Sequence, residues 1–131
     1  MALALADAGI QPPDLAHVNA HGTSTVLNDR AEAAALAALL GASCPPVTAV
    51  KGSTGHMIAG SGAVEAIVSL VSLRDRLVPP VAGLRTVDPD FDLDIVQGKP
   101  RQGPPGYALS NSFGFGGANT ALVLAAWGSA S

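Results

Sequence analysis

The sequence predicts a mixed α/β fold, in which helices pack on a sheet that has both parallel and antiparallel strands. Short apolar runs alternate with helical segments through the first half of the chain, an order typical of parallel strands joined by helices. Near the end, two strand-like segments, 107–111 and 120–127, follow one another across a glycine-rich link, as in a hairpin. The 131 residues suit a single domain.

The first elements of the chain are a helix end, a turn and a buried strand. Residues 2–9 are typical of the last turns of a helix that ends at Gly9. No capping residue precedes this helix, so we expect further chain upstream of it. Pro12 and Pro13 then form a turn, and residues 15–20 are apolar enough for a short buried strand.

A helix and a second strand follow. Asp29 and Glu32 have the spacing of a capping box, which predicts a helix over residues 31–40 that ends at Gly41. Residues 47–50 are the next short apolar run and are expected to form the second strand.

The stretch from Lys51 to Leu73 is the most unusual part of the sequence. A glycine-rich turn leads into a helix over about 60–74 whose apolar residues surround the whole axis, which is typical of a helix covered by protein on every side. The run is shorter than the roughly 20 residues that a membrane span needs, so we expect no membrane segment. Glu65 lies in its middle and needs a cation, for which Lys51 is the nearest candidate. Alternatively, Glu65 reaches solvent at a helix edge.

The remaining segments are a proline-rich edge, a long irregular stretch and the terminal pair of strands. Residues 78–81 are expected to form an edge segment, and 83–106 to be irregular apart from one short strand over 93–96. In the link over 112–119, glycines can direct backbone N–H groups at a ligand, and two phenylalanines alternate with them. This pattern fits either a hinged loop that carries an aromatic plug or an ordinary hairpin turn.

Two histidines occupy equivalent places, each in a polar loop that follows a predicted strand. His21 follows the first strand and His56 the second. Such loops are where α/β folds place their sites. We expect His56 inside the protein, at or just before the helix start, where partial positive charge keeps its imidazole neutral and able to donate an N–H to a substrate oxygen. A core histidine bonded to a carbonyl is the alternative, but the repeated placement favours function.

Composition narrows the possible partners and the compartment. Charged residues make up only 13% of the chain, against about 25% in ordinary soluble domains. We therefore expect another body of protein to cover part of the surface. The net charge of −3 gives no footprint for nucleic acid. A single cysteine, Cys44, excludes an internal disulfide and indicates a reducing, cytoplasmic location. No neighbour of Cys44 would lower its pKa, so it is not expected to be a nucleophile. The N-terminus does not resemble a signal peptide.

Three motifs together carry a resemblance to a known family. They are Asn19-Ala-His21-Gly-Thr-Ser-Thr25, Lys51-x-x-x-Gly55-His56-x-x-Ala-Gly60-x-Gly-Ala-Val-Glu65 and Asn111-Ser-Phe-Gly-Phe-Gly-Gly117. In this order and spacing they strongly resemble the C-terminal half of β-ketoacyl-[acyl-carrier-protein] synthases, the condensing enzymes of fatty-acid and polyketide synthesis. The resemblance implies one half of a thiolase-like fold, a mixed sheet with a buried helix layer, to which the helix over about 60–74 would belong.

The resemblance implies a role for each matching residue in the decarboxylation of malonyl-carrier protein. His21 and His56 match the histidines that hold the thioester carbonyl, and Lys51 matches the lysine that pairs with the helix glutamate, here Glu65. Two N–H donors aimed at the enolate oxygen stabilise its charge, each by about 3–4 kcal/mol.

The same resemblance implies a tunnel and a gate. Thr23 and Thr25 match hydroxyls that line the pantetheine tunnel. Phe115 matches the gating phenylalanine, whose backbone N–H also contributes to the oxyanion hole, within the loop of Gly114, Gly116 and Gly117.

The resemblance also implies partners and what is missing. The family's nucleophilic cysteine belongs to an N-terminal half that this chain does not include, so we expect the chain to be inactive without that half. The implied partners are acyl carrier protein, the N-terminal half and, in the complete enzyme, a second copy. No metal or bound cofactor is implied, because the substrate is carried on phosphopantetheine. Val26 replaces the usual proline of the first motif.

Two other functions compete with this hypothesis. A non-catalytic module, similar to a chain-length factor, would bind acyl-pantetheine or support dimerisation without chemistry; the intact His21, Lys51 and His56 argue against it. A metal-dependent hydrolase using His17, His21 and His56 would lack an acidic ligand at metal spacing. Thiolases are a poorer match, since no cysteine follows the glycine-rich link.

Overall fold

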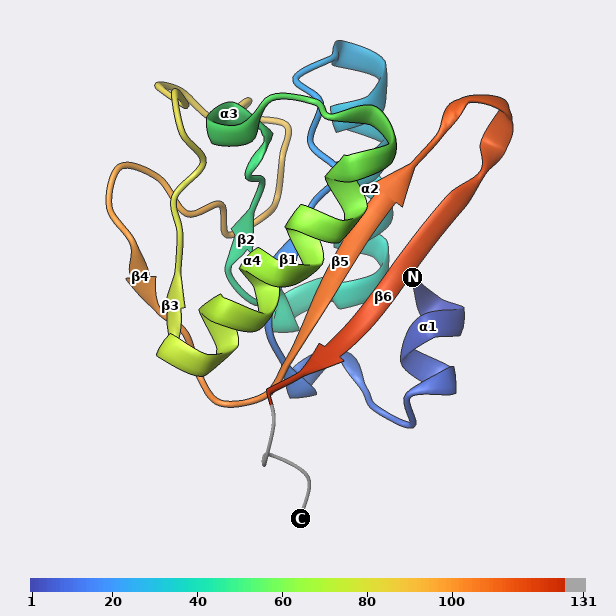
Figure 1. The fold of residues 1–131 in the computed structure, drawn as a ribbon, viewed down its shortest axis with the longest axis vertical. Coiled ribbons are helices and arrows are strands. Elements are labelled where there is room, and N and C mark those ends of the chain that lie inside the picture. Colours follow the sequence, from blue (N-terminus) through green and yellow to red (C-terminus); the bar gives the residue numbers. More distant parts are fainter. Residues whose placement is uncertain (127–131) are drawn as a thin grey trace.

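In the computed structural model, which describes residues 1–126, a four-stranded sheet has helices on both faces (Figure 1). The strand order is β2-β1-β5-β6, with β1 at Leu15–Asn19, β2 at Val47–Thr48, β5 at Tyr107–Phe113 and β6 at Asn119–Ala125. Strand β1 runs parallel to both β2 and β5, whereas β5 and β6 form an antiparallel hairpin. The predicted mixed α/β fold is confirmed.

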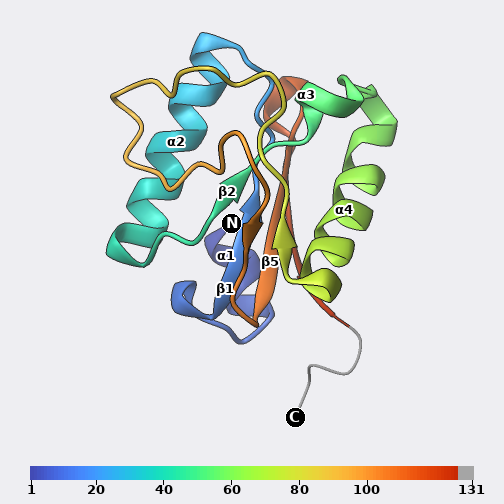
Figure 2. The ribbon, with the colours of Figure 1, turned by 90° about the vertical axis from the view of Figure 1, so that its left-hand side faces the viewer.

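The helices divide between the two faces of the sheet (Figure 2). Helices α1 (Ala2–Asp7) and α2 (Val26–Leu40) lie on one face, and α4 (Ser61–Asp75) covers the other. The short α3 (Lys51–Thr54) stands at the edge where β1, β2 and β5 end. Because the carboxyl ends of parallel strands share one edge, the loops after β1 and β2 meet there.

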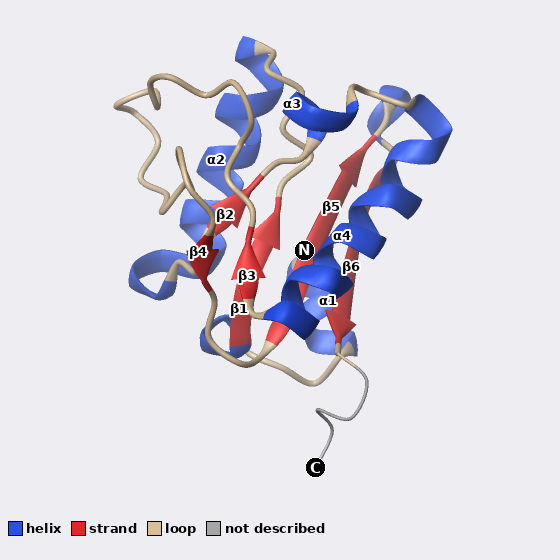
Figure 3. Ribbon diagram, turned by 60° about the vertical axis from the view of Figure 1, so that its left-hand side comes forward, coloured by secondary structure: helices blue, strands red, loops and turns tan. Residues whose placement is uncertain are grey.

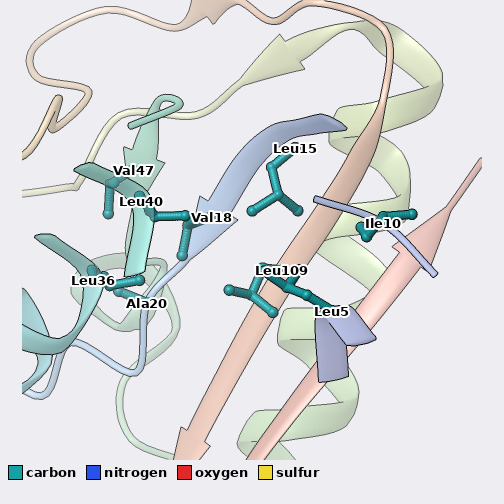
Figure 4. Close-up of a cluster of buried hydrophobic side chains, with 9 residues drawn as sticks. All are labelled: Leu5, Ile10, Leu15, Val18, Ala20, Leu36, Leu40, Val47 and Leu109. Carbon is teal, nitrogen blue, oxygen red and sulfur yellow. The ribbon is translucent and has the colours of Figure 1, made fainter. Parts of the chain in front are cut away.

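The main core lies between the sheet and the helices α1 and α2 (Figure 4). It consists of nine buried side chains, namely Leu5, Ile10, Leu15, Val18, Ala20, Leu36, Leu40, Val47 and Leu109. Leu36 and Leu109 are at most 1% exposed, and truncation of such a leucine to alanine typically costs about 2–5 kcal/mol. This core fixes the strand ends that carry the site.

Helix α2 and strand β2 differ from their predicted bounds. The helix begins at Val26 with Thr25 as its N-cap, so the capping box at Asp29 and Glu32 is wrong. Glu32 lies a full turn and a half inside the helix, on its buried side with Leu36. Strand β2 ends at Thr48 rather than at residue 50, because the chain turns there into α3.

The segment between α4 and β5 contains a small second sheet that the sequence did not predict (Figure 3). Strands β3 (Leu77–Val78) and β4 (Arg101–Gln102) pair antiparallel. The predicted strand over 93–96 is reduced to one parallel bridge between Ile95 and Val47. Four short 3-10 helices complete the described chain, at Pro12–Asp14, Gly41–Ser43, Ile58–Gly60 and Phe115–Gly117.

The terminal pair of strands is a hairpin whose first strand is longer than predicted. Strand β5 extends to Phe113, and β6 begins at Asn119 and ends at Ala125. Trp127, which the sequence placed at the end of this strand, lies outside the described residues.

Helix α4 lies on the sheet with its polar side inward, and within this chain its apolar side is uncovered. Glu65, Ser69 and Ser72 are buried, at intervals that form one stripe. The apolar side chains of Ile67, Leu70 and Val71 are 60%, 39% and 41% exposed. The stripe faces inward because β5 presents small and polar residues on this face: Ala108 packs with Leu73 of α4, and Ser110 is on the same side of the strand. No helix in the described residues is long and apolar enough to cross a membrane.

Candidate functional site

The predicted site residues gather at the edge where the parallel strands end. His21 lies two residues after β1, Lys51 is the first residue of α3, and Phe113 is the last residue of β5. Three segments that are far apart in the sequence therefore meet at one place (Figure 1).

Lys51 is the buried centre of this arrangement. Its side-chain ammonium pairs with the Glu65 carboxylate, donates to the carbonyl oxygen of His21, and lies 3.2 Å from Nδ1 of the His21 ring. Lys51 is 8% exposed and Glu65 only 1%, so Glu65 does not reach solvent. The predicted Lys51–Glu65 pair is confirmed, and it ties α3, α4 and the loop after β1 to one another.

His21 is held as a neutral N–H donor. An ammonium group has only hydrogens to donate, so Nδ1 of His21 accepts from Lys51 and the ring proton is on Nε2. Burial, together with the positive charge of Lys51 and the nearby His56, lowers the pKa of His21 from 6.5 to about 4. The ring is therefore uncharged at neutral pH, with its Nε2–H unused by Lys51.

His56 has the same tautomer but a different setting. The backbone N–H of Ile58 lies 3.1 Å from Nδ1, and the Ser61 hydroxyl lies 3.2 Å from the same atom. A backbone N–H can only donate, so the proton of the neutral ring is again on Nε2. The centroids of the His21 and His56 rings are 5.5 Å apart, with the ring planes nearly perpendicular at 86°.

His56 precedes the helix start, as predicted, but the expectation that it lies inside the protein is wrong for this chain. His56 is exposed in this chain, and four residues separate it from the start of α4 at Ser61. Ile58 adopts a left-handed backbone conformation with φ of 51°, which interrupts the helix before it can reach His56. The alternative of a core histidine is also wrong, since His56 is exposed.

Glu32 shapes the loop that carries His21, a role the sequence interpretation missed. Its carboxylate accepts from the backbone N–H groups of His21 at 2.8 Å and Gly22 at 3.0 Å, and from the Asn111 amide at 3.0 Å. The signal was available, because Glu32 shares one helical stripe with Leu36 and Leu40. Gly22 itself has φ of 44°, and a Cβ there would lie 2.6 Å from the Cβ of Ala49.

The threonines and the hairpin border the site. The hydroxyl oxygens of Thr23 and Thr25 are 3.0 Å apart, just before the first residue of α2. Phe113 has its ring centroid 5.5 Å from that of His21, and the sequence did not single it out for this contact. Phe115 extends fully into solvent from the hairpin tip.

The tip itself is a tight turn, in agreement with the hairpin interpretation. The Gly114 N–H donates to the Ala118 carbonyl at 2.8 Å, and Gly116 and Gly117 have φ of 77° and 83°. These positive angles explain why glycines occupy the turn.

The other candidate residues lie elsewhere. His17 lies in β1 and is 1% exposed, and burial lowers its pKa to about 4. Cys44 is half-buried, donates weakly to the Pro45 carbonyl at 3.5 Å, and has its pKa raised chiefly by burial. Within the part of the chain that the structure describes, no group of three or more His, Cys, Asp or Glu side chains is arranged to hold a metal ion.

Comparison with known proteins identifies the family. The family model described as "Beta-ketoacyl synthase, C-terminal domain" matches residues 1–85. This chain belongs to the β-ketoacyl synthase family. It is 49% identical over 117 residues to 3-oxoacyl-[acyl-carrier-protein] synthase 2 of Mycobacterium leprae, and 47% identical to the protein of the same name from Mycobacterium tuberculosis. The match covers 89% of this chain but 28% of either relative, so the chain spans under a third of their length.

Solved ketosynthase structures share its fold. A structure described as "The ishigamide ketosynthase/chain length factor" superposes with a TM-score of 0.92 at 34% identity, over 97% of this chain and 32% of that one. A β-ketoacyl synthase from Burkholderia phymatum gives 0.91 at 38% identity, over 96% and 31%. A type II polyketide ketosynthase solved with its acyl-carrier protein gives 0.89 at 35% identity, over 95% and 31%. The predicted half of a thiolase-like fold is confirmed.

Proposed function

We propose that this chain forms the C-terminal half of a ketosynthase active site, in which His21 and His56 stabilise the enolate formed from malonyl-carrier protein. One observation carries the proposal. Both rings have Nδ1 occupied by a hydrogen-bond donor, so both present an Nε2–H from centres 5.5 Å apart. Two N–H donors near one thioester oxygen are what an enolate needs for charge stabilisation.

The proposed reaction is a decarboxylative condensation. The bond between the malonyl methylene and its carboxylate breaks, CO2 leaves, and the electron pair becomes the enolate held by the two histidines. The enolate carbon then attacks an acyl thioester on a cysteine of the N-terminal half, and that cysteine leaves as the thiolate. His21 fits the role of a neutral donor because its pKa of about 4 keeps it uncharged.

In this proposal the hydroxyls of Thr23 and Thr25 line the route of the phosphopantetheine arm, which carries the substrate on an acyl carrier protein. Both threonines lie at the N-terminal end of α2, next to the loop that carries His21. Phe115, with Gly114, Gly116 and Gly117, is proposed as the gate, and its backbone N–H as an oxyanion donor to the acyl thioester. Its support is the position of the hairpin tip directly beyond Phe113, which neighbours His21.

The N-terminal half is proposed to cover the outward face of α4. Ile67, Leu70 and Val71 are exposed there, although apolar side chains of this size gain about 1.5–3 kcal/mol each from full burial. A protein surface that buries them would complete a central helix layer. We further propose that the complete enzyme is a homodimer, as the family resemblance implies.

The experiment is a decarboxylation assay on the complete synthase, in which this chain is joined to the N-terminal half that carries the cysteine. Conversion of malonyl-carrier protein to acetyl-carrier protein is measured. His21→Ala and His56→Ala should each lower the rate by about 10²–10³-fold. The matched control is His17→Gln, which removes a histidine from β1, outside the site, and should leave the rate per folded molecule unchanged.

The competing function makes the opposite prediction. Some structural relatives are complexes with a chain-length factor, for which a binding role without chemistry is the alternative. If both histidine variants retain the wild-type rate, the catalytic proposal is wrong and a binding module is favoured.

A further inference from the structure

The Ser61 side chain connects the His56 ring to the turn that carries it. Ser61 is the first residue of α4 and is 4% exposed. Its Oγ accepts the backbone N–H of Met57 at 2.9 Å and lies 3.2 Å from Nδ1 of His56. One hydroxyl therefore touches both the backbone next to His56 and the ring itself.

The direction of the Ser61–His56 hydrogen bond follows from the other donors. Nδ1 of His56 already accepts the backbone N–H of Ile58 at 3.1 Å, so it carries no proton in the neutral ring. The Ser61 hydroxyl must then be the donor to Nδ1, while its lone pair accepts from Met57. The two donors share one ring nitrogen, and the proton of the ring is left on Nε2.

This second donor matters because the first one rests on a strained turn. Ile58 is a β-branched residue at φ of 51°, a conformation that such residues rarely adopt and that the surroundings must hold in place. His56 is exposed, and the ring contact that the structure gives it is the edge-on one with His21. Ser61 stands on a fifteen-residue helix anchored by the buried Glu65, and it bonds to both parts of the turn.

We infer that Ser61 is a positioning residue for His56: its hydroxyl fixes the ring orientation and the Nε2–H tautomer by donating to Nδ1 from the rigid start of α4. The inference rests on the proposed function, in which the Nε2–H of His56 donates to the thioester oxygen. Ser61 does not touch the substrate in this arrangement, and it acts only through the ring.

The first test reads the ring directly and needs no activity. The chain is labelled with ¹⁵N at histidine, and the Nδ1 and Nε2 shifts of His56 are measured in wild type, Ser61→Ala and Ser61→Thr. Ser61→Ala should populate the Nδ1–H tautomer, which moves the Nδ1 resonance upfield and the Nε2 resonance downfield. Ser61→Thr keeps a hydroxyl and should restore the wild-type shifts. Ser69→Ala is the matched control, since Ser69 lies on the same buried stripe but donates to the Glu65 carbonyl.

The second test measures malonyl decarboxylation in the complete synthase. Loss of one hydrogen bond that orients the ring should lower the rate about five- to tenfold in Ser61→Ala, with recovery in Ser61→Thr. In a His56→Ala background, Ser61→Ala should cause no further loss, because its effect passes through the ring. A residue with a merely structural role would lower the rate in both backgrounds.

The two tests separate the inference from the proposed function. If wild type does not decarboxylate malonyl-carrier protein, the proposed function is wrong, and the ring shifts alone decide whether Ser61 sets the tautomer. If Ser61→Ala leaves both ring shifts where Ser69→Ala leaves them, Ser61 does not hold His56 and the inference is overturned. The same holds if Ser61→Ala lowers the rate equally with and without His56.

Discussion

Lys51 is the residue on which the geometry of the site depends most. It is a buried cation that contacts a carboxylate, a backbone carbonyl and a ring nitrogen at once. Lys51→Ala leaves the buried Glu65 charge without its cation, and loss of one partner of such a pair typically costs about 3–5 kcal/mol in the free energy of unfolding. The second change, Glu65→Ala, should recover part of this loss, because both charges are then gone. Denaturant unfolding of the four members of the cycle measures the coupling.

Arg74→Ala is the control for this cycle. It breaks the exposed ion pair with Asp75, which solvent screens, and should leave the unfolding free energy unchanged. Additive losses for Lys51 and Glu65 would contradict the pairing.

The buried histidines predict how stability depends on pH. The pKa values of His17 and His21 fall from 6.5 to about 4 in the folded chain. Between these values the unfolded chain binds more protons than the folded one, so stability is fully present above pH 6.5 and is lost as the pH falls towards 4. The slope is at most about 1.4 kcal/mol per pH unit for each histidine.

The measurement is the unfolding free energy at several pH values across this window. His17→Gln should reduce the slope, because one of the two titrating groups is removed. A stability that stays flat from neutral pH down to the lower pKa would show that these rings are not held neutral.

At the scale of elements, the exposed side of α4 is apolar, as expected of a helix that another protein surface covers. Its polar stripe faces the sheet and its apolar side faces away. Ile67→Asp should therefore leave the unfolding temperature of this chain unchanged, since Ile67 is 60% exposed. The same change should weaken association with the N-terminal half by tenfold or more, because the lost burial of such a side chain is worth about 1.5–3 kcal/mol. Calorimetric titration of the two separately expressed halves measures the affinity. The control is Leu3→Asp, a change at an exposed residue of α1 on the opposite face of the sheet. Equal affinities for all three proteins would place the partner elsewhere.

The hairpin of β5 and β6 is the second element with a separable role. Its tip carries Phe115 in solvent, so Phe115→Ala should leave the unfolding temperature unchanged. In the complete synthase the same change should alter the rate of acylation and the preference for acyl-chain length, if the tip acts as a gate. Phe113→Ala is the comparison, because that ring neighbours His21 and is partly buried. A Phe115→Ala protein that unfolds earlier but acylates normally would make Phe115 a packing residue.

At the scale of the whole molecule, the described residues hold the two imidazole N–H donors of the proposed site but no activated thiol. Cys44 is half-buried with a raised pKa, away from the edge where the histidines meet. The chain alone should therefore give no β-ketoacyl product from malonyl-carrier protein and an acyl donor, and the complete synthase should give product. Product formed by the chain alone, and retained in Cys44→Ala, would contradict the division of the site between two halves. Mass spectrometry of the carrier protein reads both outcomes.

The sequence by itself determined the family, the order along the chain of the four strands of the main sheet, and the Lys51–Glu65 pair. The reason is physical: an ionised glutamate inside an apolar helix needs a cation, and the motif supplied one at the turn before it. Polar loops after two successive apolar runs likewise placed His21 and His56 at one sheet edge, since parallel strands end together.

Only the tertiary structure decided which side of each helix is buried and which atoms meet at the site. The apolar residues of α4 surround its axis, so periodicity could not reveal that the stripe of Glu65, Ser69 and Ser72 is the buried side. Glu32 fits a capping box by spacing, but its carboxylate bonds to the loop of His21 because α2 begins a turn earlier at Val26. The tautomer of His56 depends on the left-handed turn at Ile58 and on the Ser61 hydroxyl, and a single non-glycine residue at positive φ leaves no trace in sequence pattern.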